Sequence, residues 1–161
     1  QLDTGNVLIK KKVFEKCGLF DRQFEKMRMG DGEFGVRAYI NGFKNISNPK
    51  APREHLKIAE GGLRDMGHWD AFRPKNIFGP RPVASVLYFW RKYWGNKATI
   101  LSCINTMPFS INPYFLKGKL KGYIISIILV LLLFPLLIIQ LLRSWSKSSK
   151  MIKRGPLIER L

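Results

Sequence analysis

The sequence predicts an α/β domain that is followed by amphipathic segments and one C-terminal transmembrane helix. Three observations support this fold class. Strand-like and helix-like stretches alternate over the first 57 residues, which is typical of an α/β layer. Aromatic and basic residues are interleaved at 83–94, and residues 122–142 carry no charge. The four expected regions are a domain at 1–82, an interfacial linking region at 83–121, a transmembrane helix at 122–142 and a basic tail at 143–161.

The first elements of the domain are short. Residues 5–9 are expected to form a strand, and Val13 to Cys17 are expected to form a helix that Gly18 closes, since glycine is common just past a helix C-terminus. Phe24 and Met27 should pack back onto the core. So few residues cannot bury a full core, and we therefore expect the chain to be part of a longer protein.

A second helix is expected from Gly32 to Asn41, and it is followed by a strand from Phe43 to Ile46. Val36, Tyr39 and Ile40 recur at helical spacing and are the expected apolar face of this helix. Gly42 supplies the stop signal, and the Asn48-Pro49 pair ends the strand.

The most informative residue is Asp31, at the start of that second helix. Gly30 and Gly32 bracket it, which allows a tight turn and close approach by another molecule. We expect its carboxylate to cap the helix by accepting a hydrogen bond from a free helix amide. Helix N-termini favour negative charge, so an ionised carboxylate here could instead accept a proton from a substrate hydroxyl. The residues alone leave both roles open.

Motifs on both sides of Asp31 resemble the C-terminal half of the catalytic domain in family 2 glycosyltransferases. Aligned on Glu33 and Arg37, Asp31 takes the place of the Asp in the acidic motif of that family, and Gly30 stands where the common pattern has Glu. The resemblance covers roughly residues 3–57. The other matching motifs, in chain order, are Gly5-Asn6, Gly18-Leu19-Phe20-Asp21, Asn41-Gly42-Phe43 and His55.

The resemblance implies the acceptor-side part of a Rossmann-like nucleotide-diphospho-sugar transferase domain. Such an enzyme transfers a sugar, with inversion, from a nucleotide-diphosphate donor to the hydroxyl of a glycan or lipid-linked acceptor, as in cell-surface polysaccharide or glycolipid synthesis. Asp31 is the implied catalytic base. Because the donor-binding half is not in this chain, the chain alone is expected to be inactive. The implied substrate-binding residues are Gly5, Asn6, Glu33 and Arg37, and of these Glu33 and Arg37 are expected to hold the helix and the acceptor edge rather than to do chemistry. Trp69, further along the chain, is a candidate for stacking on a sugar face.

The resemblance also implies a divalent metal, Mn²⁺ or Mg²⁺, held mainly by residues outside this chain. His55 matches a His that many enzymes of this family place near the metal-bound diphosphate. An ordinary surface histidine is the alternative for His55, and a loop anchor is the alternative for Trp69. Asp65, His68 and Asp70 lie in the same Gly-rich loop, but no helical or hairpin spacing brings them together with His55.

The net charge of +17 suggests an anionic partner, either nucleic acid or a membrane surface. Arg91 and Lys92 adjoin Tyr93 and Trp94, a pattern that suits an interfacial helix, a helix packed on the domain, or a single-stranded nucleic-acid site. Lys and Arg residues on both sides of 122–142 make up part of the positive net charge, and anionic lipid headgroups would attract them. We therefore expect a membrane partner and no nucleic acid.

Residues 122–142 reach roughly 30 Å as a helix, which matches the hydrocarbon core of a bilayer. Pro135 can be tolerated within a membrane. The segment before it, 98–116, is interrupted by Pro108 and Pro113 and is expected to link or lie in plane. A single-pass or monotopic protein with a cytoplasmic catalytic part is expected, although basic flanks on both sides do not fix orientation. The alternative function is a non-enzymatic membrane-anchored binding module whose basic surface binds anionic lipid or polysaccharide.

Overall fold

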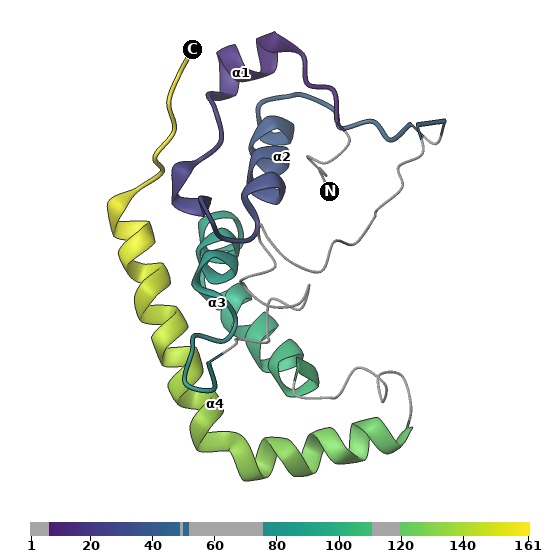
Figure 1. The fold of residues 1–161 in the computed structure, drawn as a ribbon, viewed down its shortest axis with the longest axis vertical. Coiled ribbons are helices and arrows are strands. Elements are labelled where there is room, and N and C mark those ends of the chain that lie inside the picture. Colours follow the sequence, from purple (N-terminus) through teal and green to yellow (C-terminus); the bar gives the residue numbers. More distant parts are fainter. Residues whose placement is uncertain (1–6, 49, 52–75, 111–119) are drawn as a thin grey trace.

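The computed structural model describes residues 7–48, 50–51, 76–110 and 120–161 (Figure 1). This part of the chain is helical and contains no strand. The predicted α/β, Rossmann-like fold is therefore wrong for the residues described. The elements, in chain order, are α1 (Lys11–Cys17), the 3₁₀ helix η2 (Arg22–Phe24), α2 (Gly30–Ile40), α3 (Ala84–Ser110) and α4 (Leu120–Arg154).

The two predicted strands are absent wherever the structure describes them. Residues 7–9 and 43–46 have no neighbouring strand among the described residues, and an isolated strand cannot satisfy its own backbone groups. Phe43 instead donates its backbone amide to the Ala38 carbonyl (3.0 Å) and packs on the cluster between α1 and α2. Leu8 and Ile46 stay exposed. Ile9 also packs on that cluster, so the apolar residues of the two stretches include two that pack on the core and others that face solvent.

Both short helices are confirmed within two residues of their predicted bounds. Gly18 ends α1 with φ +76° and donates its amide to the Phe14 carbonyl at 2.7 Å. The predicted apolar face of α2 is wrong for Tyr39 and Ile40, which are exposed, whereas Val36 packs on the cluster that contains Phe24 and Tyr88. Its buried face carries Phe34 and Ala38, which pack against Val13 and Cys17 of α1, together with the charged residues Glu33 and Arg37.

Helices α3 and α4 pack against each other. Gly95 breaks α3 with φ +77°, a conformation that glycine adopts without steric cost. Before this break, α3 is buried from Ala84 to Phe89, so the packed-helix alternative holds for these residues. The predicted Phe24 and Met27 contacts are confirmed, since both side chains pack with this part of α3. From Leu137 onwards the buried residues of α4 recur every three or four positions: Leu137, Gln140, Ser144, Ser148 and Met151.

The first half of α4 is long and apolar enough to cross a membrane, and it has few intramolecular contacts. Only 12% of its most apolar stretch of 18 residues is buried, whereas the core helix of a soluble protein is mostly buried. The helix bends along its length (Figure 1), and it contains Pro135. The predicted helix over 122–142 is confirmed, and it continues to Arg154 with no boundary at 142.

The segment after α4 runs back along the loop that follows α1. Gly155 turns the chain with φ +75°. The Leu19 amide then donates to the Glu159 carbonyl (2.8 Å), and the Arg22 amide donates to the Leu157 carbonyl (3.0 Å). The predicted basic tail at 143–161 is thus part helix and part ordered segment, docked on the N-terminal region (Figure 1).

Candidate functional site

Asp31 lies in the first turn of α2. The helix begins at Gly30 because Met29 adopts a left-handed conformation (φ +77°) and its carbonyl accepts the Glu33 amide at 2.8 Å. The predicted N-cap role of Asp31 is therefore wrong, since Met29 occupies the cap position and makes no side-chain cap. The half-buried Asp31 carboxylate instead accepts the amide of its neighbour Gly32 at 2.8 Å.

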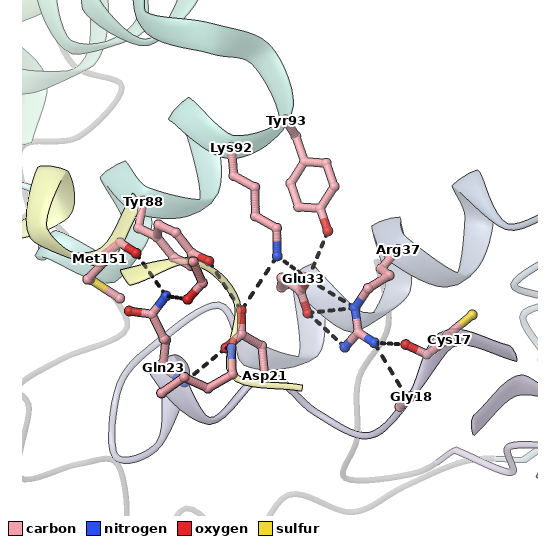
Figure 2. Close-up of polar contacts among 12 residues, drawn as sticks. Cys17, Gly18, Asp21, Gln23, Glu33, Arg37, Tyr88, Lys92, Tyr93 and Met151 are labelled. Atoms are coloured by element: carbon pink, nitrogen blue, oxygen red, sulfur yellow. Dashed lines mark hydrogen bonds and ion pairs between the residues drawn. The ribbon is translucent and has the colours of Figure 1, made fainter. Parts of the chain in front are cut away.

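A fully buried carboxylate, Glu33, lies two residues further along α2. Figure 2 shows that it receives donors from two helices. From α2 itself, Arg37 donates through Nε at 3.1 Å and through Nη2 at 3.0 Å. From α3, Lys92 Nζ and the Tyr93 hydroxyl each donate to Glu33 Oε1 at 2.8 Å. Glu33 therefore ties α2 to α3.

Arg37 extends this network towards α1. Its Nη1 donates to the Cys17 carbonyl and its Nη2 donates to the Leu19 carbonyl (2.9 Å). These carbonyls lie at the C-terminal end of α1 and just beyond it, where helix carbonyls lack intrahelical partners and favour a cation. One guanidinium thus joins the end of α1 to the buried carboxylate of α2.

A second buried carboxylate, Asp21, completes the network (Figure 2). Its Oδ1 accepts the backbone amides of Gln23 and Leu157, each at 3.0 Å. Its Oδ2 lies 3.3 Å from the Tyr88 hydroxyl, which donates to it, and 3.5 Å from Lys92 Nζ. Through these donors Asp21 links the loop after α1 to α3 and to the C-terminal segment.

Charge is balanced in this network, because the carboxylates of Asp21 and Glu33 face the cations of Arg37 and Lys92. Balance matters because an unpaired buried charge is strongly destabilising. Burial, and then the negative charge of Glu33, raise the pKa of Tyr93 well above its ordinary value. Burial, and then the charge of Asp21, raise the pKa of Tyr88 in the same way. Both hydroxyls therefore remain protonated donors.

Three of the predicted site residues, Asp31, Glu33 and Arg37, lie on α2. Glu33 and Arg37 hold α2 in place through their contacts with each other, with α3 and with the end of α1. Their contact with a substrate stays a prediction. Among the described residues, the Asp31 carboxylate makes no hydrogen bond or ion pair with the residues of the network drawn in Figure 2. Gly5, Asn6, His55 and Trp69 lie outside the described residues.

No group of three metal-ligating side chains occurs among the residues that the structure describes. Asp21 and Glu33 are the closest candidates by residue type, but both carboxylates are occupied by Lys92, and Glu33 is also occupied by Arg37. These residues do not fit a divalent metal. The metal expected from the resemblance remains a prediction about His55 and about residues outside this chain.

Sequence reasoning missed the role of α3 in this site. Lys92 and Tyr93 read as interfacial residues, yet both donate into the buried network. The available signal was weak. Tyr88 and Lys92 are four residues apart, so both lie on one helix face, but nothing local shows which carboxylates that face will meet. Comparison with known proteins adds no relative, since no family model, curated protein or solved structure matches the chain.

Proposed function

We propose that this chain is the acceptor-side part of a membrane-attached inverting glycosyltransferase. The enzyme transfers a sugar from a nucleotide-diphosphate donor to the hydroxyl of a glycan or lipid-linked acceptor. The observation that carries the proposal is the start of α2, where Asp31 is a half-buried carboxylate outside the buried network. The reaction class comes from the motifs around Asp31 that resemble family 2 glycosyltransferases.

In this mechanism Asp31 accepts the proton of the acceptor hydroxyl as its oxygen attacks the anomeric carbon of the donor. A new bond forms between the acceptor oxygen and that carbon, the bond to the diphosphate oxygen breaks, and the nucleoside diphosphate leaves. Attack from the opposite face inverts the configuration of the sugar. The chemistry that Mn²⁺ or Mg²⁺ supplies is neutralisation of charge on the diphosphate, and the residues that hold it are expected mainly outside this chain.

The buried network gives Asp31 a rigid support in this proposal. A catalytic group must be held within about 0.5 Å of its productive position by residues that are themselves fixed. Glu33 lies two residues from Asp31 and is fixed by Arg37, Lys92 and Tyr93. These residues position α2 and take no part in the chemistry.

Membrane attachment is proposed to occur through the first half of α4. Its exposed apolar side chains cover one broad side of the helix, and residues 122–142 carry no charged residue on any side, whereas a helix that lies in the plane of the interface has a charged or polar face. They are Ile124, Ile127, Ile128, Leu131, Leu132 and Phe134. We expect the protein to stay with membranes through high-salt and alkaline washes and to leave only with detergent. Release by high salt alone would contradict this attachment.

A binding module remains the second candidate because of the charged face of α4. Arg143, Lys147, Lys150 and Arg154 are all exposed, and their spacing of four, three and four residues places them on one side of the helix. Such a stripe is suited to anionic headgroups or an anionic polysaccharide. This candidate requires membrane association without sugar transfer.

A transfer assay separates the two candidates. Membranes that contain the full-length protein are incubated with labelled nucleotide-diphospho-sugars, and label is counted in the lipid and glycan fractions. The glycosyltransferase predicts label in a product, with release of the nucleoside diphosphate in equal amount. Tight binding of anionic lipid or polysaccharide with no transfer from any donor would favour the binding module.

A further inference from the structure

We infer that this chain enters the membrane as a helical hairpin. Its first leg is α3 beyond Gly95, from Asn96 to Ser110, and its second leg is α4 up to about Leu137. This inference rests on the membrane attachment proposed above and goes beyond it, because α4 alone would be a single pass with its two flanks in different compartments.

The first argument is that the two flanks of these legs touch each other. Arg91 of α3 donates through Nη1 to the hydroxyls of Ser148 (2.7 Å) and Ser149 (2.8 Å) on α4. Its guanidinium also stacks on the Trp145 ring, with its carbon 4.1 Å from the ring centroid. Contacts of this kind require the part of α3 before Gly95 and the part of α4 after Leu137 to lie on the same side of the bilayer.

The C-terminal segment makes the same requirement independently. Leu157 donates its amide to Asp21 at 3.0 Å, and Gln23 donates to the Met151 carbonyl at 3.0 Å. A chain that leaves one side at Gly95 and is back on that side by Leu137 crosses or enters the bilayer and returns. If α4 up to Leu137 runs through the membrane towards that side, the part of α3 beyond Gly95 must run into the membrane from it.

The second argument is that α3 beyond Gly95 lies beside the apolar part of α4. Cys103 is buried in one cluster with Leu87 and Leu137, and Val130 packs against that cluster. Leu137 and Val130 belong to the uncharged stretch of α4 that is proposed to contact hydrocarbon. Cys103 therefore lies near the depth of Leu137, at the end of the second leg, where Leu87 of the flank also packs.

The third argument is what this part of α3 exposes. Ile100, Leu101 and Ile104 are 46%, 62% and 63% exposed, and no charged residue occurs between Lys97 and Lys117. Lipid chains are the occupant that suits this face, because it is uncharged and lies on the part of α3 that packs against the apolar stretch of α4. Trp94 is exposed beside the break at Gly95, at the depth where aromatic residues gather at membrane interfaces.

Nitroxide labels on cysteines introduced one at a time test the hairpin in full-length protein reconstituted into sealed vesicles. Leu101→Cys reports the first leg and Leu131→Cys the second, while Lys12→Cys and Lys153→Cys report the two flanks. The parent protein sets the background, since Cys17 and Cys103 are buried. Oxygen and a water-soluble nickel chelate are the two relaxation probes. A membrane-impermeant maleimide, applied to the same vesicles, reports the side on which each flank lies.

The hairpin predicts that a label at Leu101 is relaxed mainly by oxygen, as at Leu131, and that labels at Lys12 and Lys153 are relaxed mainly by nickel. It also predicts that the maleimide reaches both flanks from one side. Ile104→Cys repeats the first-leg measurement if Leu101→Cys does not fold. A lipid-exposed Leu131 with a water-exposed Leu101, or flanks labelled from opposite sides, overturns the hairpin and leaves the attachment standing. Water exposure at Leu131 would instead overturn the attachment.

Discussion

Lys92 lies between two buried carboxylates, with its Nζ 2.8 Å from Glu33 Oε1 and 3.5 Å from Asp21 Oδ2. This one side chain joins the helix that carries Asp31 to the helix that leads towards the proposed membrane hairpin. Because Lys92 of α3 pairs with Glu33 of α2, the contacts that hold α3 in position also hold α2. The contact predicts that the N-terminal region and the two long helices unfold together.

Replacing Glu33 by Gln should destabilise the protein strongly. The substitution removes the negative charge that Arg37 and Lys92 share, and breaking a buried ion pair in this way costs about 3–5 kcal/mol of unfolding free energy. Denaturant titration of detergent-solubilised protein measures the loss. Glu25→Gln is the matched control, because Glu25 meets Arg22 at 4.0 Å with both side chains exposed. Equal stability of the two variants would show that the network contributes little.

Replacing Gly18 by Ala should cost more than replacing Gly42 by Ala. Both glycines have positive φ values, +76° and +88°, so each substitution strains the backbone by roughly 1–3 kcal/mol. A Cβ on Gly18 would in addition meet the Ile158 side chain and lie 2.9 Å from the Glu159 carbonyl oxygen, whereas a Cβ on Gly42 would meet nothing within 4 Å.

The excess cost should therefore appear as displacement of the C-terminal segment. Hydrogen exchange of the Leu19 amide, which donates to the Glu159 carbonyl, measures that displacement directly. We expect faster exchange in Gly18→Ala and unchanged exchange in Gly42→Ala. Protection that is the same in both variants would mean that the segment does not pack on Gly18.

Stability should fall at alkaline pH because of Tyr93. Its pKa in the folded protein is raised above the ordinary value of 10.0 by burial and by Glu33. Above about pH 10 the unfolded chain releases a proton that the folded protein keeps, so stability falls as pH rises, by up to ~1.4 kcal/mol per pH unit. Below that pH the contribution is complete and constant.

Unfolding free energies of Tyr93→Phe and of the parent, measured from about pH 8 to pH 11, test this. Tyr93→Phe should be less stable near neutral pH, because it loses the hydrogen bond to Glu33, and should show a shallower alkaline decline. Tyr39→Phe is the control, since Tyr39 is 69% exposed. An unchanged decline in Tyr93→Phe would assign the alkaline loss to other groups.

Local signals predicted local structure well. The glycine after Cys17 and the periodicity around Asp31 located α1 and α2 to within two residues, because helices are stabilised by contacts close in sequence. Strands depend on distant partners, and the apolar alternation at 43–46 could not reveal that no partner strand lies beside it in the described residues. The uncharged run at 122–142 located the apolar helix, since length and composition suffice for that prediction.

The site was only partly predictable for the same reason. Asp31, Glu33 and Arg37 lie within seven residues, and the spacing of Glu33 and Arg37 indicates a helical ion pair. The donors from Lys92 and Tyr93 arrive from nearly sixty residues away, and Leu157 reaches Asp21 across 136 residues. Contacts of that range depend on how α3 and α4 pack, which no local pattern encodes.

The most direct test of the proposed function is the rate of sugar transfer by Asp31→Asn in the full-length protein. Asn can still accept the Gly32 amide at this half-buried position, so the fold should be retained while the base is lost. Turnover should fall by about 10²-fold or more, the usual contribution of a positioned base. The control Glu15→Gln, at an exposed carboxylate 3.5 Å from Lys11, should keep the parent rate. Transfer by a folded Asp31→Asn variant at close to the parent rate would contradict the account.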